Sequence, residues 1–213
     1  NIQIKNIDEF LFFRYCSGNK TLFKNVFQCL PGHYMEYSGN ELKSKKYWDI
    51  KNKEIEISDP VLDTRNILSS SIDYQLISDV EVGTQLSGGI DSSLITAISA
   101  SRRKDSIKTF SIIFPNSKLN EENYIDKINK EYELNNYKSE FQAQYLFDDL
   151  DKTTWHFDQP LSQPNSIGIY HLSKLASQHL KVILSGEGAD ELFGGYDRFL
   201  PARIFTKYPF LSK

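Results

Sequence analysis

One stretch of this sequence combines glycines, hydroxyls and a carboxylate in the way that a nucleotide site requires. It runs from Gln85 to Ser93 and reads Q-L-S-G-G-I-D-S-S. Glycines let the backbone approach a polyphosphate closely, and a helix that begins at the turn adds the positive end of its dipole. Asp91 would repel phosphate unless it holds a magnesium ion that bridges the phosphates. The string therefore predicts a site that grips the pyrophosphate of a nucleotide.

This string differs from the classical P-loop. No G-x-x-x-x-G-K-[ST] pattern occurs in the chain, and the turn has no lysine that would supply a point charge for a γ-phosphate. The difference favours a loop that holds the β- and γ-phosphates as a leaving group, with attack at the α-phosphorus and release of AMP. The alternative is a plain tight turn, in which Ser92 only caps a helix.

A second glycine-rich string follows the short apolar run at 181–184. It extends from Ser185 to Tyr196 and reads S-G-E-G-A-D-E-L-F-G-G-Y. Ligands of open parallel sheets bind at the carboxyl ends of the strands, so two such turns can converge on one ligand. The alternative is that Glu187, Asp190 and Glu191 only cap and solubilise the first turn of a helix, whose dipole favours acids.

The elements that must position these strings alternate between strands and helices. A helical pattern begins at Asp59, and the region after it predicts a strand at 80–86, a helix at 92–102, a strand at 107–114, a helix at 120–133, a strand at 137–141, a helical stretch at 144–156, a helix at 166–179 and a strand at 181–184. Such alternation predicts right-handed crossovers and an α/β fold with a parallel, doubly wound sheet.

Residues 1–53 have a different pattern. The alternating run at 33–37, the turn residues Ser38-Gly39-Asn40 and a returning segment at 41–48 predict a β-hairpin. This β-rich part is too short to bury a core alone and looks like the trailing edge of another domain. The charged run at 51–54 is a candidate linker to a second domain at 54–213.

Together, the two strings resemble the synthetase domain of glutamine-dependent asparagine synthetases, which belong to the pyrophosphate-loop ATPases with an adenine-nucleotide hydrolase-like fold. The segments Leu30–Tyr34 and Tyr47–Asp49 are similar to the stretch that joins the glutaminase domain to the synthetase domain in those enzymes. The resemblance covers nearly the whole chain in the right order. It implies that 1–53 is a remnant of a glutaminase domain and that 54–213 is an ATP-binding domain, incomplete at its C-terminal end.

The resemblance also implies roles for individual residues. Asp91 and Asp190 match the magnesium-binding aspartates, and Glu187 matches the glutamate needed to form the acyl-adenylate. The residues implied to bind ATP and its pyrophosphate are Leu86, Ser87, Gly88, Gly89, Asp91, Ser92, Ser93, Ile112, Ser185 and Gly186. Leu86 and Ile112 would contact adenine or ribose in one crevice. Their alternative role is that of ordinary core residues.

The activity implied by the resemblance is ATP-dependent amide formation. The side-chain carboxylate of aspartate would be adenylated with Mg²⁺-bound ATP, and ammonia derived from glutamine would then displace AMP. A mature N-terminal cysteine and a lysine beyond Lys213 are also implied, so we expect this chain to be a central piece of a longer protein with little activity of its own. A module that senses ATP without turnover is a further alternative, which the three intact acids Asp91, Glu187 and Asp190 disfavour.

The acceptor pocket is where the chain departs from the family pattern. The segment 158–165 keeps Asp158 and Pro160, but Gln159 and Gln163 stand where carboxylates are common. Exchange of a charge for an amide alters what a pocket accepts. Another carboxylate, such as a sugar acid of a surface polysaccharide, is therefore an alternative acceptor, and neutral drift of a loop is the other interpretation.

Composition supports a water-soluble protein with small-molecule substrates. The chain is 39% hydrophobic and 25% charged with a formal net charge of -3, which provides no basic field for nucleic acid or for an acidic membrane. Cys16 and Cys29 form neither a disulfide framework nor a metal motif, so we expect a cytoplasmic setting. His171 and His179 lie two turns apart on one expected helix, and no Cys or acid partner that would make a metal site is evident. A homodimer is a possible assembly of the protein.

Overall fold

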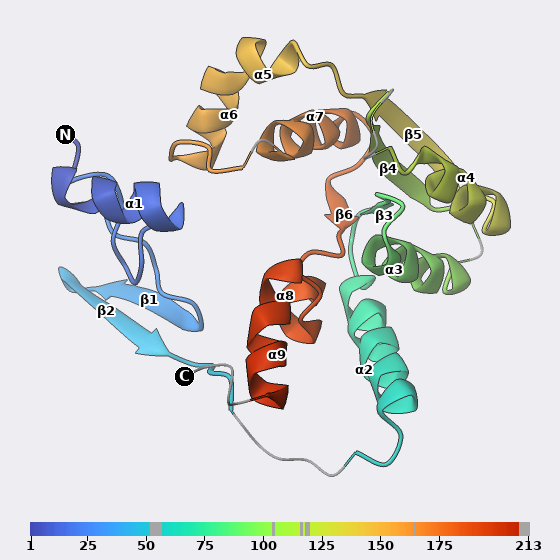
Figure 1. Cartoon of the computed structure of the whole chain (residues 1–213), viewed down its shortest axis with the longest axis horizontal. Helices are drawn as coiled ribbons and strands as arrows, with labels where there is room; N and C mark the ends of the chain where they lie inside the picture. Colours follow the sequence, from blue (N-terminus) through green and yellow to red (C-terminus); the bar gives the residue numbers. More distant parts are fainter. Residues whose placement is uncertain (52–56, 104, 116, 118–119, 164, 209–213) are drawn as a thin grey trace. The chain divides into compact units, whose positions relative to one another are not determined.

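The computed structural model describes residues 1–51, 57–103, 105–115, 117, 120–163 and 165–208 (Figure 1). The chain forms two compact units. The first combines Asn1–Ser58 with Leu150–Pro164, and the second combines Asp59–Asp149 with Asn165–Lys213. Most of the expected linker at 51–54, together with the expected boundary after residue 53, lies outside the described residues.

A parallel sheet forms the centre of the second unit. Its strands are β3 (Val82–Gln85), β4 (Lys108–Ile113), β5 (Asn135–Glu140) and β6 (Val182–Leu184), in the order β5-β4-β3-β6 with every neighbouring pair parallel. The predicted parallel α/β sheet is thus confirmed, with strands that are shorter than or shifted from the expected ranges. The order places β3 and β4, whose connection is the first crossover, in the middle of the sheet.

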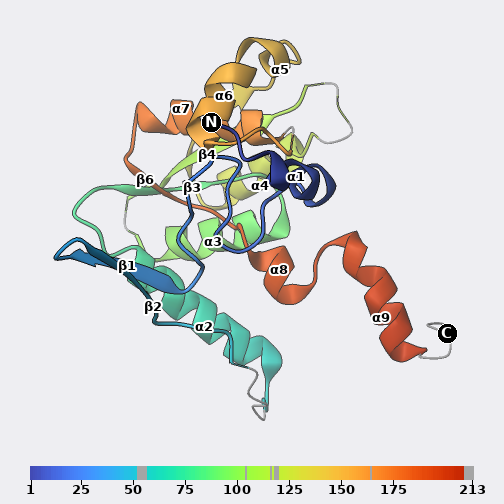
Figure 2. The same ribbon diagram turned by 90° about the vertical axis from the view of Figure 1, so that its left-hand side faces the viewer.

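Helices cover both faces of this sheet. The helices of the second unit as a whole are α2 (Pro60–Gln75), α3 (Ile90–Ser101), α4 (Glu122–Glu131), α5 (Tyr145–Asp148), α7 (Asn165–Ser177), α8 (Ala189–Phe193) and α9 (Leu200–Lys207), with a 3₁₀ turn at Asp197–Phe199. α7 packs on β4 and β5, whereas α3 packs on β3 and contacts α2 and α4 (Figure 2). The helices α3 and α4, which connect β3 to β4 and β4 to β5, therefore lie on one face of the sheet. α7, which lies between β5 and β6 in the chain, covers the other face.

Two predicted helices differ from the structure. α3 begins at Ile90 and not at residue 92, because Gly89 has the extended conformation of the N-cap; Asp91 therefore lies in the first helical turn. The expected helix at 144–156 is two helices, α5 and α6 (Leu150–Phe157), which belong to different units. The break lies at Asp149, whose φ of -113° and ψ of 9° leave the α-helical range.

The pleat of β3 divides its side chains between the two faces of the sheet. Val82 packs with residues of α2 and α3, and Leu86, just beyond the strand, packs with Ile113 and Ile125. Thr84 lies between them on this face, where its hydroxyl is 2.9 Å from that of Thr96 on α3. Because alternate residues of a strand point in opposite directions, Gln85 must point towards the face covered by α7.

The α7 face of the sheet carries the aromatic part of the core. Phe110 of β4 is completely buried and packs with Leu172 and Ala176 of α7. Its ring stacks on that of Tyr137 from β5, with 5.4 Å between centroids. Ile112 follows on the same face and is half-buried, which leaves it accessible at the carboxyl end of its strand.

The first unit contains the predicted hairpin and one helix that we did not predict. α1 (Ile7–Phe13) buries Phe10, while β1 (His33–Ser38) and β2 (Glu41–Lys46) pair antiparallel with His33 opposite Lys46. Gly39 and Asn40 form the two-residue turn with φ values of 57° and 65°, as a hairpin of this type requires. Over the described residues, no helix is long and apolar enough to cross a membrane.

The buried hydroxyl pair between β3 and α3 yields a stability prediction. Thr84 and Thr96 are both fully buried, so replacement of either by valine leaves the other hydroxyl without its partner. We expect each single variant to lower the free energy of unfolding by about 1–3 kcal/mol and the double variant to lie near the parent protein. Denaturant unfolding measures this cycle, and additive losses in the double variant would show that the pair is not coupled.

Candidate functional site

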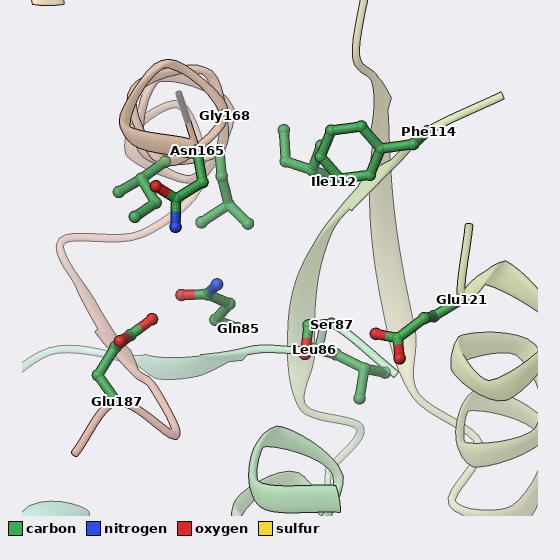
Figure 3. A pocket seen from close by; sticks show the side chains of 11 residues that line it. Gln85, Leu86, Ser87, Ile112, Phe114, Glu121, Asn165, Gly168 and Glu187 are labelled. Atoms are coloured by element: carbon green, nitrogen blue, oxygen red, sulfur yellow. The ribbon is translucent and has the colours of Figure 1, made fainter. Parts of the chain in front are cut away.

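A cavity of about 170 Å³ lies at the carboxyl ends of β3 and β4, on the face of the sheet that α7 covers (Figure 3). Ile112 and Phe114 form an apolar wall from β4, and Ile169 and Leu172 face them from α7. The remaining lining residues are Gln85, Leu86, Ser87, Glu121, Asn165, Gly168 and Glu187. A cavity with apolar walls and a few polar groups is typical of a site for a small organic ligand.

Side chains reach this cavity because of the alternation along the strands. Ile112 and Phe114 are two residues apart in β4 and its extension, so they share the α7 face. The side chain of Leu86 instead packs with Ile113 and Ile125 towards α4, which leaves its main chain available to a ligand. Leu86 and Ile112 thus line one cavity, as expected, but their side chains belong to opposite faces of the sheet.

A second cavity, of about 260 Å³, adjoins the first and is strongly acidic. Asp91 comes from the first turn of α3, whereas Glu187, Asp190 and Glu191 come from the loop after β6 and the start of α8. The other lining residues are Gln85, Ser87, Gly89, Ser92, Gly186, Gly188 and Tyr196. The two glycine-rich strings therefore meet in space, as their strand-end positions predict.

Close approach of the two strings depends on a glycine at position 186. A Cβ atom added there would lie 2.9 Å from the backbone nitrogen of Ser92 and 3.0 Å from the Cβ of Asp91. Contacts this short are not tolerated, so any larger residue would push the loop after β6 away from the start of α3. The backbone of one string consequently forms part of the wall of the other.

The loop after β3 is held in shape by its own serines. The Ser92 hydroxyl accepts a hydrogen bond from the Ser87 amide at 3.1 Å and lies 2.8 Å from the Ser87 hydroxyl. It also donates to the carbonyl of Gly89 at 3.2 Å. Ser92 is thus not the helix cap that we considered; its hydroxyl instead closes the loop from within the first turn of α3.

The predicted site residues fall into four groups. Leu86 and Ile112 line the first cavity, Ser87 and Glu187 line both cavities, and the residues that line only the second are Gly89, Asp91, Ser92, Gly186 and Asp190. Gly88, Ser93 and Ser185 line neither cavity. These positions describe geometry, and the functional roles of the residues remain predictions.

Several lining residues were not predicted from the sequence. Gln85 is the first residue of the first string, but no binding role was predicted for it, and its place in a buried strand was the only available signal. Phe114, Glu121, Asn165 and Tyr196 also line the cavities. Phe114, Glu121 and Asn165 come from separate segments, which the packing of α4 and α7 against the sheet brings together. Tyr196 is the last residue of the second string.

The acids of the second cavity differ in their hydrogen bonding. The hydroxyl of Tyr196 donates to Glu191 at 2.7 Å, and this bond holds the pKa of Glu191 below its usual value, with help from the backbone and from Arg198. The same bond raises the pKa of Tyr196. Within the described part of the chain, no group of three or more His, Cys, Asp or Glu residues is arranged to hold a metal ion by itself.

One histidine has an acidic partner that the sequence did not reveal. The Nε2 of His171 lies 3.0 Å from Oδ2 of Asp149, and both side chains are nearly buried. The imidazole also stacks on Tyr145, with 3.9 Å between ring centroids. The pair fixes α5 against α7 and lies 22 residues apart in sequence, which is why no local pattern revealed it.

The fold and the cavities of the second unit define its class. A parallel sheet flanked by helices, with cavities at the carboxyl ends of its strands, defines the second unit as a Rossmann-like α/β domain. A family model described as asparagine synthase matches residues 63–211. The chain belongs to the asparagine synthase family.

Individual relatives agree with this assignment. The chain is 32% identical over 209 residues to asparagine synthetase [glutamine-hydrolyzing] 1 of Bacillus subtilis, a match that covers 95% of this chain and 33% of that protein. It is 30% identical to asparagine synthetase [glutamine-hydrolyzing] 3 of the same organism, over 89% of this chain and 34% of the relative. A putative asparagine synthetase [glutamine-hydrolyzing] 2 of Methanocaldococcus jannaschii is 26% identical, with 92% and 39% covered. The chain thus spans about a third of the length of these relatives.

The first prediction from the site concerns Gly88. Its φ of +90° disfavours a side chain, and an added Cβ would lie 2.9 Å from the backbone oxygen of Glu121. Gly188 has a φ of +97° with nothing within 4 Å, so it is a matched control for conformation alone. We expect Gly188→Ala to cost about 1–2 kcal/mol and Gly88→Ala to cost more, as measured by denaturant unfolding. Equal losses would mean that Glu121 yields without cost.

The second prediction concerns the hydrogen bond between Tyr196 and Glu191. In Tyr196→Phe, the pKa of Glu191 is expected to rise towards its usual value, because the largest cause of its lowering is removed. The bond favours the ionised carboxylate, so its contribution is present above the usual carboxyl pKa and is lost as the pH falls through the lowered value. NMR titration of the carboxyl carbon measures the shift, and an unchanged pKa would contradict the assignment.

Proposed function

We propose that this chain is the nucleotide-binding part of an ATP-dependent, amide-forming synthetase that adenylates the side-chain carboxylate of aspartate. The observation that carries the proposal is the pair of adjoining cavities at the carboxyl ends of β3 and β6, one with apolar walls and one rich in acids. A nucleoside fits the chemistry of the first cavity, and a metal-bound pyrophosphate fits that of the second. Membership of the asparagine synthase family supports the reaction type.

In this proposal, the nucleoside lies against Ile112 and Phe114, with the main chain of Leu86 beside it. The β- and γ-phosphates lie at the loop from Ser87 to Ser93, where the first amides of α3 have no partner within the helix. A helix of 12 residues also directs the positive end of its dipole at this point. Ser185 and Gly186 would contribute backbone contacts to the adenylate.

The acids of the second cavity fit a magnesium ion when phosphate is present. Mg²⁺ prefers hard oxygen ligands, and it is usually held by one or two carboxylates together with substrate phosphates. Asp91 and Asp190 come from the two different strings and line the same cavity, so they are the residues that would hold it. When bound, the ion would neutralise negative charge on the phosphate oxygens.

The chemistry asked of the protein's own groups is positioning and charge stabilisation. An oxygen of the acceptor carboxylate forms a bond to the α-phosphorus, and the bond from that phosphorus to the bridging oxygen of the β-phosphate breaks. The electron pair leaves with pyrophosphate, whose charge is stabilised by the amides at the start of α3. Ammonia from glutamine then attacks the acyl carbon, gives up a proton and expels AMP. Glu187, on the rim of both cavities, positions the acceptor or the incoming amine.

A second acceptor remains a candidate because of Gln159 and Gln163. Both residues belong to the first unit, where Gln159 lines a pocket with Asp158, Phe157 and residues of the N-terminal segment. An amide in place of a carboxylate favours an acceptor with different charge from aspartate. An amidotransferase that modifies another carboxylate, such as a sugar acid, would retain the same nucleotide chemistry.

The proposal is tested by ATP–pyrophosphate exchange catalysed by the full-length protein with added aspartate. Aspartate-dependent exchange is the expected result, whereas exchange with only another acid of a panel would assign the second acceptor. A protein that binds ATP but gives no exchange with any acid would contradict the synthetase and favour an ATP sensor.

The magnesium assignment is tested with Asp91→Asn. Magnesium-dependent binding of pyrophosphate is expected to weaken by about tenfold or more, since even indirect partners of a metal contribute about 10–100-fold to affinity. Asp126→Asn is the matched control, because this aspartate of α4 pairs with Lys138 of β5 and lines neither cavity. Titration calorimetry gives both affinities, and equal binding by the two variants would remove Asp91 from the site.

A further inference from the structure

Gln85 stands at the boundary between the two cavities. Only three residues line both of them among those that the structure describes, and these are Gln85, Ser87 and Glu187. If the nucleoside occupies one cavity and the pyrophosphate the other, as in the proposed function on which this inference rests, the α-phosphate that joins them lies beside these three residues. The boundary is therefore where the reacting phosphorus would be.

The three boundary residues offer different chemistry to an anionic phosphate. The carboxylate of Glu187 repels it. The hydroxyl of Ser87 already contacts the Ser92 hydroxyl at 2.8 Å and accepts a hydrogen bond from the Gly89 amide at 3.3 Å. Gln85 carries a neutral amide with two N–H donors, and it points into the first cavity (Figure 3). Its side chain makes no hydrogen bond with the residues that the structure describes.

The backbone of β3 holds Gln85 in this position. On the opposite face, Thr84 is fully buried and bonded to Thr96, and Leu86 is fully buried against Ile113 and Ile125. Both neighbours are thus fixed, so the direction of the Gln85 side chain is set by the pleat and not by a mobile loop. A donor on a rigid strand is well suited to stabilise charge, because it needs no reorganisation when the charge develops.

We propose that the side-chain amide of Gln85 donates a hydrogen bond to a non-bridging oxygen of the α-phosphate of ATP. This contact would fix the orientation of the α-phosphorus towards the acceptor carboxylate and stabilise the charge on its oxygens. It assigns a ligand-binding role to the first residue of the Gln85–Ser93 string, for which the sequence predicted none. The contact is expected to be stereospecific, because a single donor on the strand would face only one of the two non-bridging oxygens.

The test uses ATP analogues in which sulfur replaces one non-bridging α-oxygen. Sulfur is a weak hydrogen-bond acceptor, so the full-length protein is expected to bind the two diastereomers with magnesium at different affinities. Gln85→Met keeps the length of the side chain but removes the amide. We expect this variant to bind ATP about tenfold to a hundredfold more weakly and to lose most of the preference between diastereomers.

Controls separate this contact from a general effect on folding. Gln75→Met changes an exposed glutamine on α2 that bonds to Ser71, and it is expected to leave both affinities unchanged. Gln85→Asn keeps an amide on a shorter side chain, and it is measured in the same way should the methionine variant not fold. Calorimetry gives the affinities, and thermal unfolding confirms that each variant is folded.

Each outcome decides between the two proposals. An unchanged preference between diastereomers in the folded Gln85 variant, or equal binding of both by the parent protein, would overturn the α-phosphate contact. A lost preference without any ATP–pyrophosphate exchange would keep the contact and contradict the synthetase. A parent protein that binds no ATP would overturn both.

Discussion

The candidate site depends on the burial of β3 on both of its faces. This strand pairs with β4 on one side and β6 on the other, so neither edge is free. Its side chains are fixed by α2 and α3 on one face and by the α7 layer on the other. A strand held in this way has one register. A slip by one residue would turn the side chains that face α2 and α3 towards α7, and those that face α7 towards α2 and α3. The loop after Gln85 consequently leaves the sheet at a defined point.

Beyond this point, the fold brings two acidic loops together. The repulsion between their carboxylates is offset by the helix amides around them. Asp91, Glu187 and Asp190 line one small cavity, where like charges disfavour one another. Asp91 and Asp190 lie in the first turns of helices, whose amides favour negative charge. The absence of a side chain at Gly186 allows the two backbones to meet. An arrangement of this kind is poised for a cation or for a ligand that carries one.

Membership of the asparagine synthase family and the geometry of the cavities point in the same direction, although they are independent observations. The family match describes the order of motifs along the chain, whereas the cavities describe which of those motifs share space. Neither the place of Gln85 between the two cavities nor the pair of His171 with Asp149 is evident from the motifs.

The sequence alone determined the parallel α/β architecture, the hairpin and the position of both glycine-rich strings at strand ends. These features have local signals, such as a buried strand, a turn glycine or a helical repeat. Tertiary structure alone decided that α3 begins at Ile90, that Ser92 closes the loop, and that Gln85, Glu121 and Asn165 line the site. It also paired Asp149 with His171 and divided the expected helix at 144–156 into α5 and α6. Such features arise from contacts between segments distant in sequence, and no local pattern records which distant segments pack together.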